Sequence, residues 1–190
     1  MTDEDVDEAM ILRFKDGDER AFADLVSRHK EPLHRFIFRY VQDHAEAEAL
    51  LFDCFIRAWR GRLSYERTAQ FQTWLFSIAI NLCRDYGRKR TRRPGDFAST
   101  SVEFCAERDG APSDSDPSGI AEMNEDVEKL RQEINALPHD QKTALVLFAL
   151  EGRSQEEVSK MLGCSVKAVE TRIYHARREL RRRLGNAQEG

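Results

Sequence analysis

Basic side chains gather in two short stretches of the sequence, with an acidic stretch between them. The first holds Arg84, Arg88, Lys89, Arg90, Arg92 and Arg93, and the second holds Arg172, Arg177, Arg178, Arg181, Arg182 and Arg183. Guanidinium and ammonium groups neutralise backbone phosphates, and arginine also recognises guanine through paired hydrogen bonds. The overall net charge of −4 conceals this segregation. The two clusters therefore predict two surfaces that bind nucleic acid.

The second basic stretch belongs to a pattern that is typical of a helix-turn-helix. A capping box at Ser154 and Glu157 opens a short helix, and Gly163 makes the turn to a longer one. The second helix of such a unit enters the major groove of duplex DNA. Its apolar stripe, from Val169 to Leu184, must face the core, which leaves one polar face for DNA. The side chains expected on that face are Lys167, Thr171, Arg172, Tyr174, His175 and Arg178.

The first basic stretch ends a helix that is expected to begin near Phe71 and to end near Arg90. The side chains expected to contact DNA from this region are Asn81, Thr73, Ser77, Arg84, Arg88, Tyr65 and Phe71. Asparagine reads base edges, and the two aromatic rings are suited to stacking on unpaired bases. For both basic helices the alternative interpretation is a solvated surface without a ligand.

The elements that position these side chains are expected to be helices throughout. Apolar residues recur at helical spacing rather than alternating as in strands, and Pro32 is expected to kink or restart one helix. The stretch from Arg92 to Pro117 is rich in proline, glycine, serine and aspartate and has no apolar period. We expect an all-α protein whose two small helical domains, an N-terminal bundle and a C-terminal helix-turn-helix domain, are joined by a flexible acidic linker. The expected boundaries are 1–93 for the first domain, 94–119 for the linker and 120–190 for the second domain.

The sequence gives no support to several other classes of protein. Because it has no long apolar run and its acidic N-terminus lacks the features of a signal peptide, we expect a cytoplasmic protein without membrane insertion. The cysteines lie far apart without zinc-type spacing, which indicates buried structural thiols at Cys54 and Cys83. Since no histidine, cysteine or serine has the neighbours of a nucleophile, we expect neither an enzyme nor a cofactor or metal.

Two segments of the chain resemble a known family. The run QFQTWLFSIAIN at residues 70–81, followed by the first basic stretch, resembles the promoter-melting segment of bacterial sigma factors. The run from Leu137 to Arg181 resembles their promoter-binding domain, and the length and single linker are similar to the extracytoplasmic-function (ECF) type. The resemblance implies core RNA polymerase, promoter DNA and an anti-sigma factor as partners. It also implies that Asn81 and the loop 63–70 hold a flipped-out base of the −10 element, while the last helix reads the −35 element.

A third segment, Ala45 to Arg60, resembles the helix that docks on polymerase in this family. The side chains that the resemblance assigns to polymerase binding are Glu48, Phe52, Asp53 and Arg57. Ala49 and Phe52 depart from the polar pattern of the family, and Phe52 is either an interface anchor or an additional core residue. A second hypothesis is a helix-turn-helix transcription regulator that binds duplex DNA without acting as a polymerase subunit. The segment 71–93 discriminates between the two, because such a regulator has no need for it.

Overall fold

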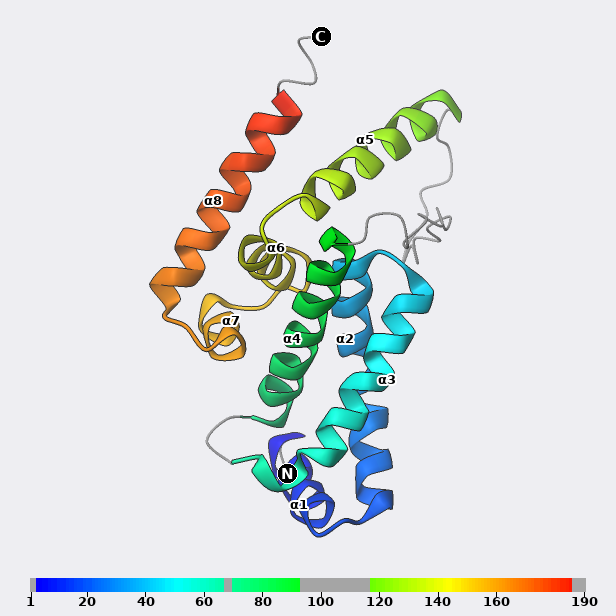
Figure 1. Cartoon of the computed structure of the whole chain (residues 1–190), viewed down its shortest axis with the longest axis vertical. Coiled ribbons are helices and arrows are strands. Elements are labelled where there is room, and N and C mark those ends of the chain that lie inside the picture. Colours follow the sequence, from blue (N-terminus) through cyan, green and yellow to red (C-terminus); the bar gives the residue numbers. More distant parts are fainter. Residues whose placement is uncertain (1–2, 67–69, 93–116, 186–190) are drawn as a thin grey trace.

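The computed structural model describes residues 3–66, 70–92 and 117–185, and every regular element in these ranges is a helix. The elements are α1 (Asp3–Lys15), α2 (Glu19–Val41), α3 (His44–Arg60), η1 (Arg62–Ser64), α4 (Phe71–Arg92), α5 (Pro117–Asn135), α6 (His139–Leu145), η2 (Val146–Leu150), α7 (Gln155–Leu162) and α8 (Val166–Gly185). The all-α prediction is confirmed. Below, α1–α4 are called the N-terminal half and α5–α8 the C-terminal half (Figure 1).

Side-chain caps start two helices of the N-terminal half. The carboxylate of Asp18 accepts hydrogen bonds from the backbone of Arg20 and Ala21 at the start of α2, and Asp43 caps α3 in the same way. Of the two outcomes expected at Pro32, a kink or a restart of the helix, the restart is wrong, because α2 runs through this residue. Leu25 and Leu33, on either side of it, are fully buried, so packing holds the helix together across the missing hydrogen bond.

Aromatic rings fill one end of the N-terminal half. The Phe14 ring stacks on Phe22 at a centroid distance of 5.2 Å and meets Phe71 edge-on at 5.8 Å. The ring of Tyr65 lies 5.1 Å from that of Trp74. This cluster fixes α1 and the first turn of α4 against each other, so the beginning of α4 is part of the core.

The C-terminal half contains the helix-turn-helix at the expected place. Ser154 and Glu157 form the capping box of α7, and Gly163 ends that helix at φ +60°, a left-handed conformation that favours glycine. The hydroxyl of Ser165 accepts a hydrogen bond from the backbone of Ala168 and so caps α8. The predicted start of this half at residue 120 differs from the structure, in which α5 begins at Pro117. Proline is compatible with the first turn of a helix, and Pro117 is therefore the first residue of α5 rather than part of the linker.

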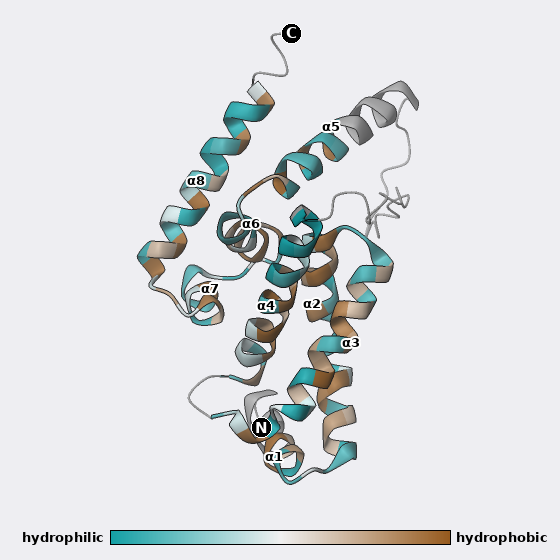
Figure 2. Ribbon diagram, in the orientation of Figure 1, coloured by the Kyte–Doolittle hydropathy of each residue, from teal (hydrophilic) through white to brown (hydrophobic). Residues whose placement is uncertain are grey.

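The two halves contact each other directly. α4 packs against α6 and α7, and α2 packs against η2, so α4 lies between the other N-terminal helices and the helix-turn-helix (Figure 1). Hydrophilic residues predominate along α8, whereas α3 carries many hydrophobic ones (Figure 2). Among the described residues, no helix combines the length and apolarity that crossing a membrane requires. Residues 93–116, which include most of the predicted linker 94–119, lie outside the described ranges.

Candidate nucleic-acid interface

The polar face of α8 is exposed along most of its length. Val169, Ile173 and Ala176 are buried on the opposite face, as the apolar stripe predicts. The Lys167 side chain is 86% exposed and Tyr174 is 62% exposed. Three other predicted contacts lie on the same side: Thr171, His175 and Arg178. The helix thus presents a cationic and hydrogen-bonding surface that a major groove can accommodate.

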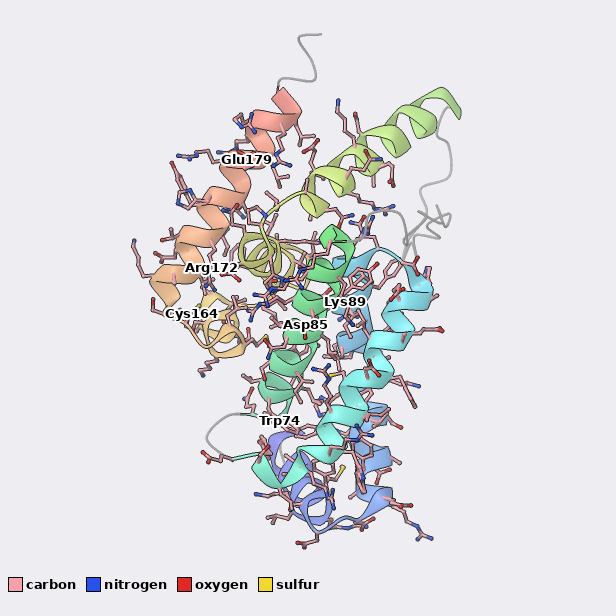
Figure 3. All side chains as sticks on the ribbon, in the orientation of Figure 1. Trp74, Asp85, Lys89, Cys164, Arg172 and Glu179 are labelled. Atoms are coloured by element: carbon pink, nitrogen blue, oxygen red, sulfur yellow. The ribbon has the colours of Figure 1, made fainter. Side chains whose placement is uncertain are left out.

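Arg172 is the exception on this face, because its guanidinium group turns back toward the protein (Figure 3). Its Nη2 donates to the carboxylate of Asp140 on α6 at 3.1 Å, and its Nη1 lies 3.3 Å from the Sγ of Cys164. The side chain is only 27% exposed. In this arrangement Arg172 is bonded to another helix, whereas Lys167 and Thr171 are bonded only to neighbours on α8, to Glu170 and to the Lys167 backbone.

The polar face of α4 is less open. Asn81 and Arg88 are exposed, whereas Ser77 is half-buried and donates its hydroxyl to the backbone oxygen of Trp74 at 2.7 Å. Arg84 lies beside Asn81, donating to its side-chain oxygen at 3.3 Å, and approaches Asp140 at 3.9 Å. Asn81 and the neighbouring cations therefore form the accessible part of this face.

Three side chains predicted to contact DNA from this region lie in the core instead. Tyr65 and Phe71 are 4% and 3% exposed within the aromatic cluster, and Thr73 is 7% exposed. A ring that already packs against other rings has no free face for a base. The structure thus corrects the stacking role that the sequence suggested for Tyr65 and Phe71, and residues 67–69 of the same loop lie outside the described ranges.

The outer face of α3 carries the residues predicted to bind polymerase. Glu48, Asp53 and Arg57 are exposed, and Phe52 is 68% exposed. Glu48 and Phe52 lie one helical turn apart, as do Asp53 and Arg57, so these residues form two neighbouring rows on the exposed side of α3. Of the two interpretations of Phe52, the structure excludes the core residue. A largely exposed phenylalanine among charges is typical of a protein interface.

Charged contacts between the halves are the main feature that the sequence did not indicate. Glu151 follows the π-helical turn η2, and its side chain is 1% exposed because α2 covers it. Arg39 and Arg35 of α2 bind its two carboxylate oxygens at 2.7 and 3.2 Å. Arg39 also donates to the backbone oxygen of Leu150. Residues so far apart in the chain leave no periodic signal in the sequence.

A second set of contacts lies between α2 and α6. The hydroxyl of Tyr40 is 2.6 Å from the Nδ1 of His139, and the Lys142 ammonium lies over the Tyr40 ring at 4.0 Å. Burial lowers the pKa of Lys142 to about 7 and that of His139 to about 4, and Arg84 reinforces the second shift. Lys142 is also bonded to Asn135, its neighbour on α5. The halves therefore meet through polar and charged groups rather than through a purely apolar surface.

The cysteines show no sign of metal chemistry within the described residues. Cys54 and Cys83 are buried, as predicted, and burial raises the pKa of Cys54 to about 12. No cluster of histidine, cysteine or acidic side chains that could hold a metal is found in the described ranges. Cys105 lies outside them.

Comparison with known proteins connects both halves to one group. The family model for Sigma-70 region 2 matches residues 25–93, and that for Sigma-70 region 4 matches residues 127–180. The chain is 33% identical to the RNA polymerase sigma-H factor of Pseudomonas aeruginosa, over 97% of this chain and 96% of that protein. It is 30% identical to the ECF RNA polymerase sigma-E factor of Escherichia coli K12, over 93% of each chain.

Two solved structures have a similar fold. CnrH in complex with the cytosolic domain of CnrY superposes with a TM-score of 0.67 at 26% identity, over 95% of this chain and 98% of that one. The sigma factor RpoE in complex with the anti-sigma factor NepR, from Bartonella quintana, gives a TM-score of 0.63 at 25% identity. That superposition covers 86% of this chain and 96% of RpoE.

Proposed function

The chain belongs to the sigma-70 family of RNA polymerase sigma factors, in its ECF group, and from this premise we propose how its two halves divide promoter recognition. Residues 1–93 bind core polymerase and the −10 element, and residues 120–190 read the −35 element as duplex. Residues 94–119 join the two. This division agrees with the chemistry of the sites, because a flipped-out base is read by hydrogen bonds to its edge, whereas duplex DNA needs a helix that fills the major groove.

The observation that carries this assignment is the position of Asn81. It is exposed on α4, between the half-buried Ser77 and the cationic Arg84 and Arg88. An amide reads a base edge while the arginines bind the adjacent phosphates. On α8, Lys167 and Arg178 serve the duplex in the same way, since both are exposed on the polar face.

The outer face of α3 is proposed as the surface that docks on core polymerase. Phe52 is its apolar centre, and Glu48, Asp53 and Arg57 form a charged rim around it. Aromatic anchors surrounded by charges contribute most of the free energy in many protein interfaces. Docking through α3 leaves the Asn81 face of α4 available to the DNA strand.

Reconstituted transcription tests the proposal. The full chain is mixed with core RNA polymerase, and transcripts are measured from a promoter identified by mapping its start sites after induction. Asn81→Ala is expected to impair open-complex formation, measured by permanganate reactivity of unpaired thymines, while Lys167→Ala changes the preference among −35 sequences. Lys30→Ala, at an exposed position of α2, is the control for loss of a charge. A wild-type promoter profile from both variants contradicts the assignment.

Docking is tested separately by the affinity for core polymerase. Phe52→Ala is expected to weaken binding by about 2 kcal/mol or more, as for other central aromatic anchors. Leu12→Ala is the matched control, because Leu12 is also apolar and is 48% exposed, but lies on α1. Equal effects of the two variants would remove α3 from the proposed interface. A chain that binds duplex DNA and never binds core polymerase would support the duplex-only regulator instead.

A regulatory partner is also proposed. Both similar solved structures are complexes, and one of them is that of a sigma factor with its anti-sigma factor. We infer that this chain is held by an anti-sigma factor in the cytoplasm and acts with polymerase once released. Co-purification of the tagged chain from cells before and after induction tests this inference.

A further inference from the structure

The two DNA-facing helices are too close together in this structure for both to read one promoter. Elements centred at −10 and −35 lie roughly 25 base pairs, or about 85 Å, apart on straight duplex DNA. Yet Arg84 of α4 and Arg172 of α8 contact the same carboxylate, that of Asp140, at 3.9 and 3.1 Å. If the proposed function is correct, the halves must separate before the promoter is engaged.

Asp140 occupies the place that DNA phosphates would take on both arginines. Its Oδ1 faces Arg84, and its Oδ2 accepts the hydrogen bond from Arg172. A carboxylate offers arginine paired acceptor oxygens, as a phosphate does. Because each guanidinium can bind either Asp140 or DNA, the closed arrangement and DNA binding compete for the same groups.

Glu151 supplies a second and better shielded contact between the halves. Its carboxylate is 1% exposed and binds both Arg35 and Arg39 of α2. Removing one partner of a buried charge pair costs more than removing an exposed one, because the other charge is left without a partner. The arginine partners of Glu151 lie on α2 rather than on α4 or α8, so its effect on DNA binding is indirect.

Steric cover adds to the effect of the charges. Arg153, at the start of the helix-turn-helix, lies over the ring of Phe76 at 5.4 Å and donates to Gln72 at 3.4 Å. Phe76 directly precedes Ser77, so α7 covers one edge of the α4 face that is proposed to bind the −10 element. A DNA strand cannot approach Asn81 from this side while α7 remains there.

We propose that Asp140 and Glu151 form a carboxylate latch, which holds the two halves in a closed arrangement that excludes promoter DNA until the latch is released. The acids come from the C-terminal half and three of the arginines, Arg35, Arg39 and Arg84, from the N-terminal half, so the pairing is complementary. Partly exposed ion pairs are individually weak, which makes the latch reversible. The proposal rests on the proposed function, since it concerns when the two DNA-binding faces become available.

Small-angle X-ray scattering of the full chain without DNA measures closure directly. The wild-type curve is expected to match the closed arrangement, and the double variant Asp140→Asn with Glu151→Gln is expected to give a larger radius of gyration. Asp24→Asn, at an exposed position of α2, is the control and should match the wild type. Circular dichroism shows whether the helices are retained. An extended wild type, or a double variant as compact as the wild type, overturns the proposal.

Affinity of the free chain for a −35 duplex provides the second readout. Glu151→Gln is expected to tighten binding at least about fivefold, the factor for an exposed ion pair at the upper end of the usual range, because the Glu151 carboxylate is buried. Asp24→Asn removes one negative charge as well, so it measures how much the change in net charge alone raises the affinity for duplex DNA. This increase must be smaller than that of Glu151→Gln. If the two variants bind equally, the latch does not restrain DNA binding.

The two proposals fail in distinguishable ways. If the chain is not a promoter-specificity factor, the wild type with core polymerase gives no promoter-dependent transcripts, whatever the scattering shows. If only the latch is wrong, the wild type transcribes normally and the double variant changes neither the scattering nor the DNA affinity.

Discussion

The two basic helices, α4 and α8, are alike in sequence and different in surroundings. Each carries an apolar stripe, a polar face and a run of arginines toward its C-terminal end. α8 packs on α6, α7 and α5 with one side and leaves the other to solvent, whereas α4 is enclosed by α2, α3 and α7. Lys167 on α8 is therefore 86% exposed, while Thr73 on α4 is 7% exposed.

This difference indicates distinct requirements for binding. The α8 face can meet duplex DNA nearly as it stands, once Arg172 has left Asp140 and the exposed Lys167 has left Glu170. The α4 face becomes fully accessible only after α7 has moved away from Phe76. Similar amphipathic patterns thus lead to one surface that is ready to bind and one that depends on a rearrangement.

The largest expected effect comes from removing a core contact of α4. Leu75 is fully buried, and its backbone oxygen faces the thiol of Cys54 on α3 at 3.7 Å. Leu75→Ala is expected to destabilise the N-terminal half by about 2–5 kcal/mol, measured by urea unfolding. Promoter opening should be lost while the −35 duplex is still bound. An equal loss of duplex binding would mean that the halves do not fold independently.

The salt dependence of duplex binding tests whether α8 alone supplies the phosphate contacts. With about three phosphates neutralised, affinity for a −35 duplex should fall roughly 40-fold between 50 and 200 mM salt. Arg178→Ala should reduce the slope of log affinity against log salt by about 0.9. Arg88→Ala, a matched change on α4, should leave this slope unchanged. A flat salt dependence, or equal effects of both arginines, would remove the distinction between the helices.

Acidification is expected to favour separation of the halves. The pKa of His139 is about 4 in the closed structure, against an ordinary 6.5, because burial and Arg84 disfavour its charged form. The open form therefore binds more protons, and the stability of the closed form falls as the pH drops from about 6.5 toward 4. The pKa of Lys142 is lowered from its ordinary 10.5 to about 7 in the closed structure. The stability of the closed form therefore also falls as the pH drops from 10.5 toward about 7.

At pH 5.5 the equilibrium between the closed and the open form is expected to shift toward the open form by up to about tenfold. Solvent screening at the partly exposed imidazole reduces this shift. The other charged and titratable groups that face this site are Tyr40, Cys83, Arg84, Arg88, Arg90 and Asp140. Scattering curves recorded between pH 8 and 5.5 measure the effect. His139→Gln should abolish the change below pH 6.5, and a variant that still opens there would show that another group titrates.

The smallest effect is expected at the cap of α7. Ser154→Ala removes the hydroxyl that accepts from the backbone of Glu157, at a cost of about 1 kcal/mol. α7 supports α8 and also covers α4, so the thermal midpoint of the C-terminal half should fall slightly. Ser159→Ala, on the same helix but away from the cap, is the control. A larger effect on −10 recognition than on −35 binding would reverse the proposed roles of α7.

Local features of the fold could be predicted from the sequence because they depend on neighbouring residues. The capping box at Ser154 and the turn at Gly163 are where short-range hydrogen bonding requires them. The start of α5 was misplaced because Pro117 suits both a linker and a first helical turn. The exposed side of α8 followed from its apolar stripe alone.

The candidate site was less predictable where several elements meet. Tyr65 and Phe71 have the residue types of a stacking surface, yet the rings of Phe14 and Trp74 enclose them. Phe52 could be either an interface anchor or a core residue, because the sequence places it at the border between the apolar and the polar face of its helix. Only the packing of α3 against α2 and α4 decided that it is exposed.

By itself, the sequence determined the helices, their caps, the two basic faces and the resemblance to sigma factors. All of these arise from patterns that repeat within a few residues, where helix geometry relates spacing directly to position. The tertiary structure decided which faces are available and brought Asp140 to Arg84 and Glu151 to Arg39. Such contacts join residues that are distant in the chain, and their energies depend on burial and distance, which no local pattern contains.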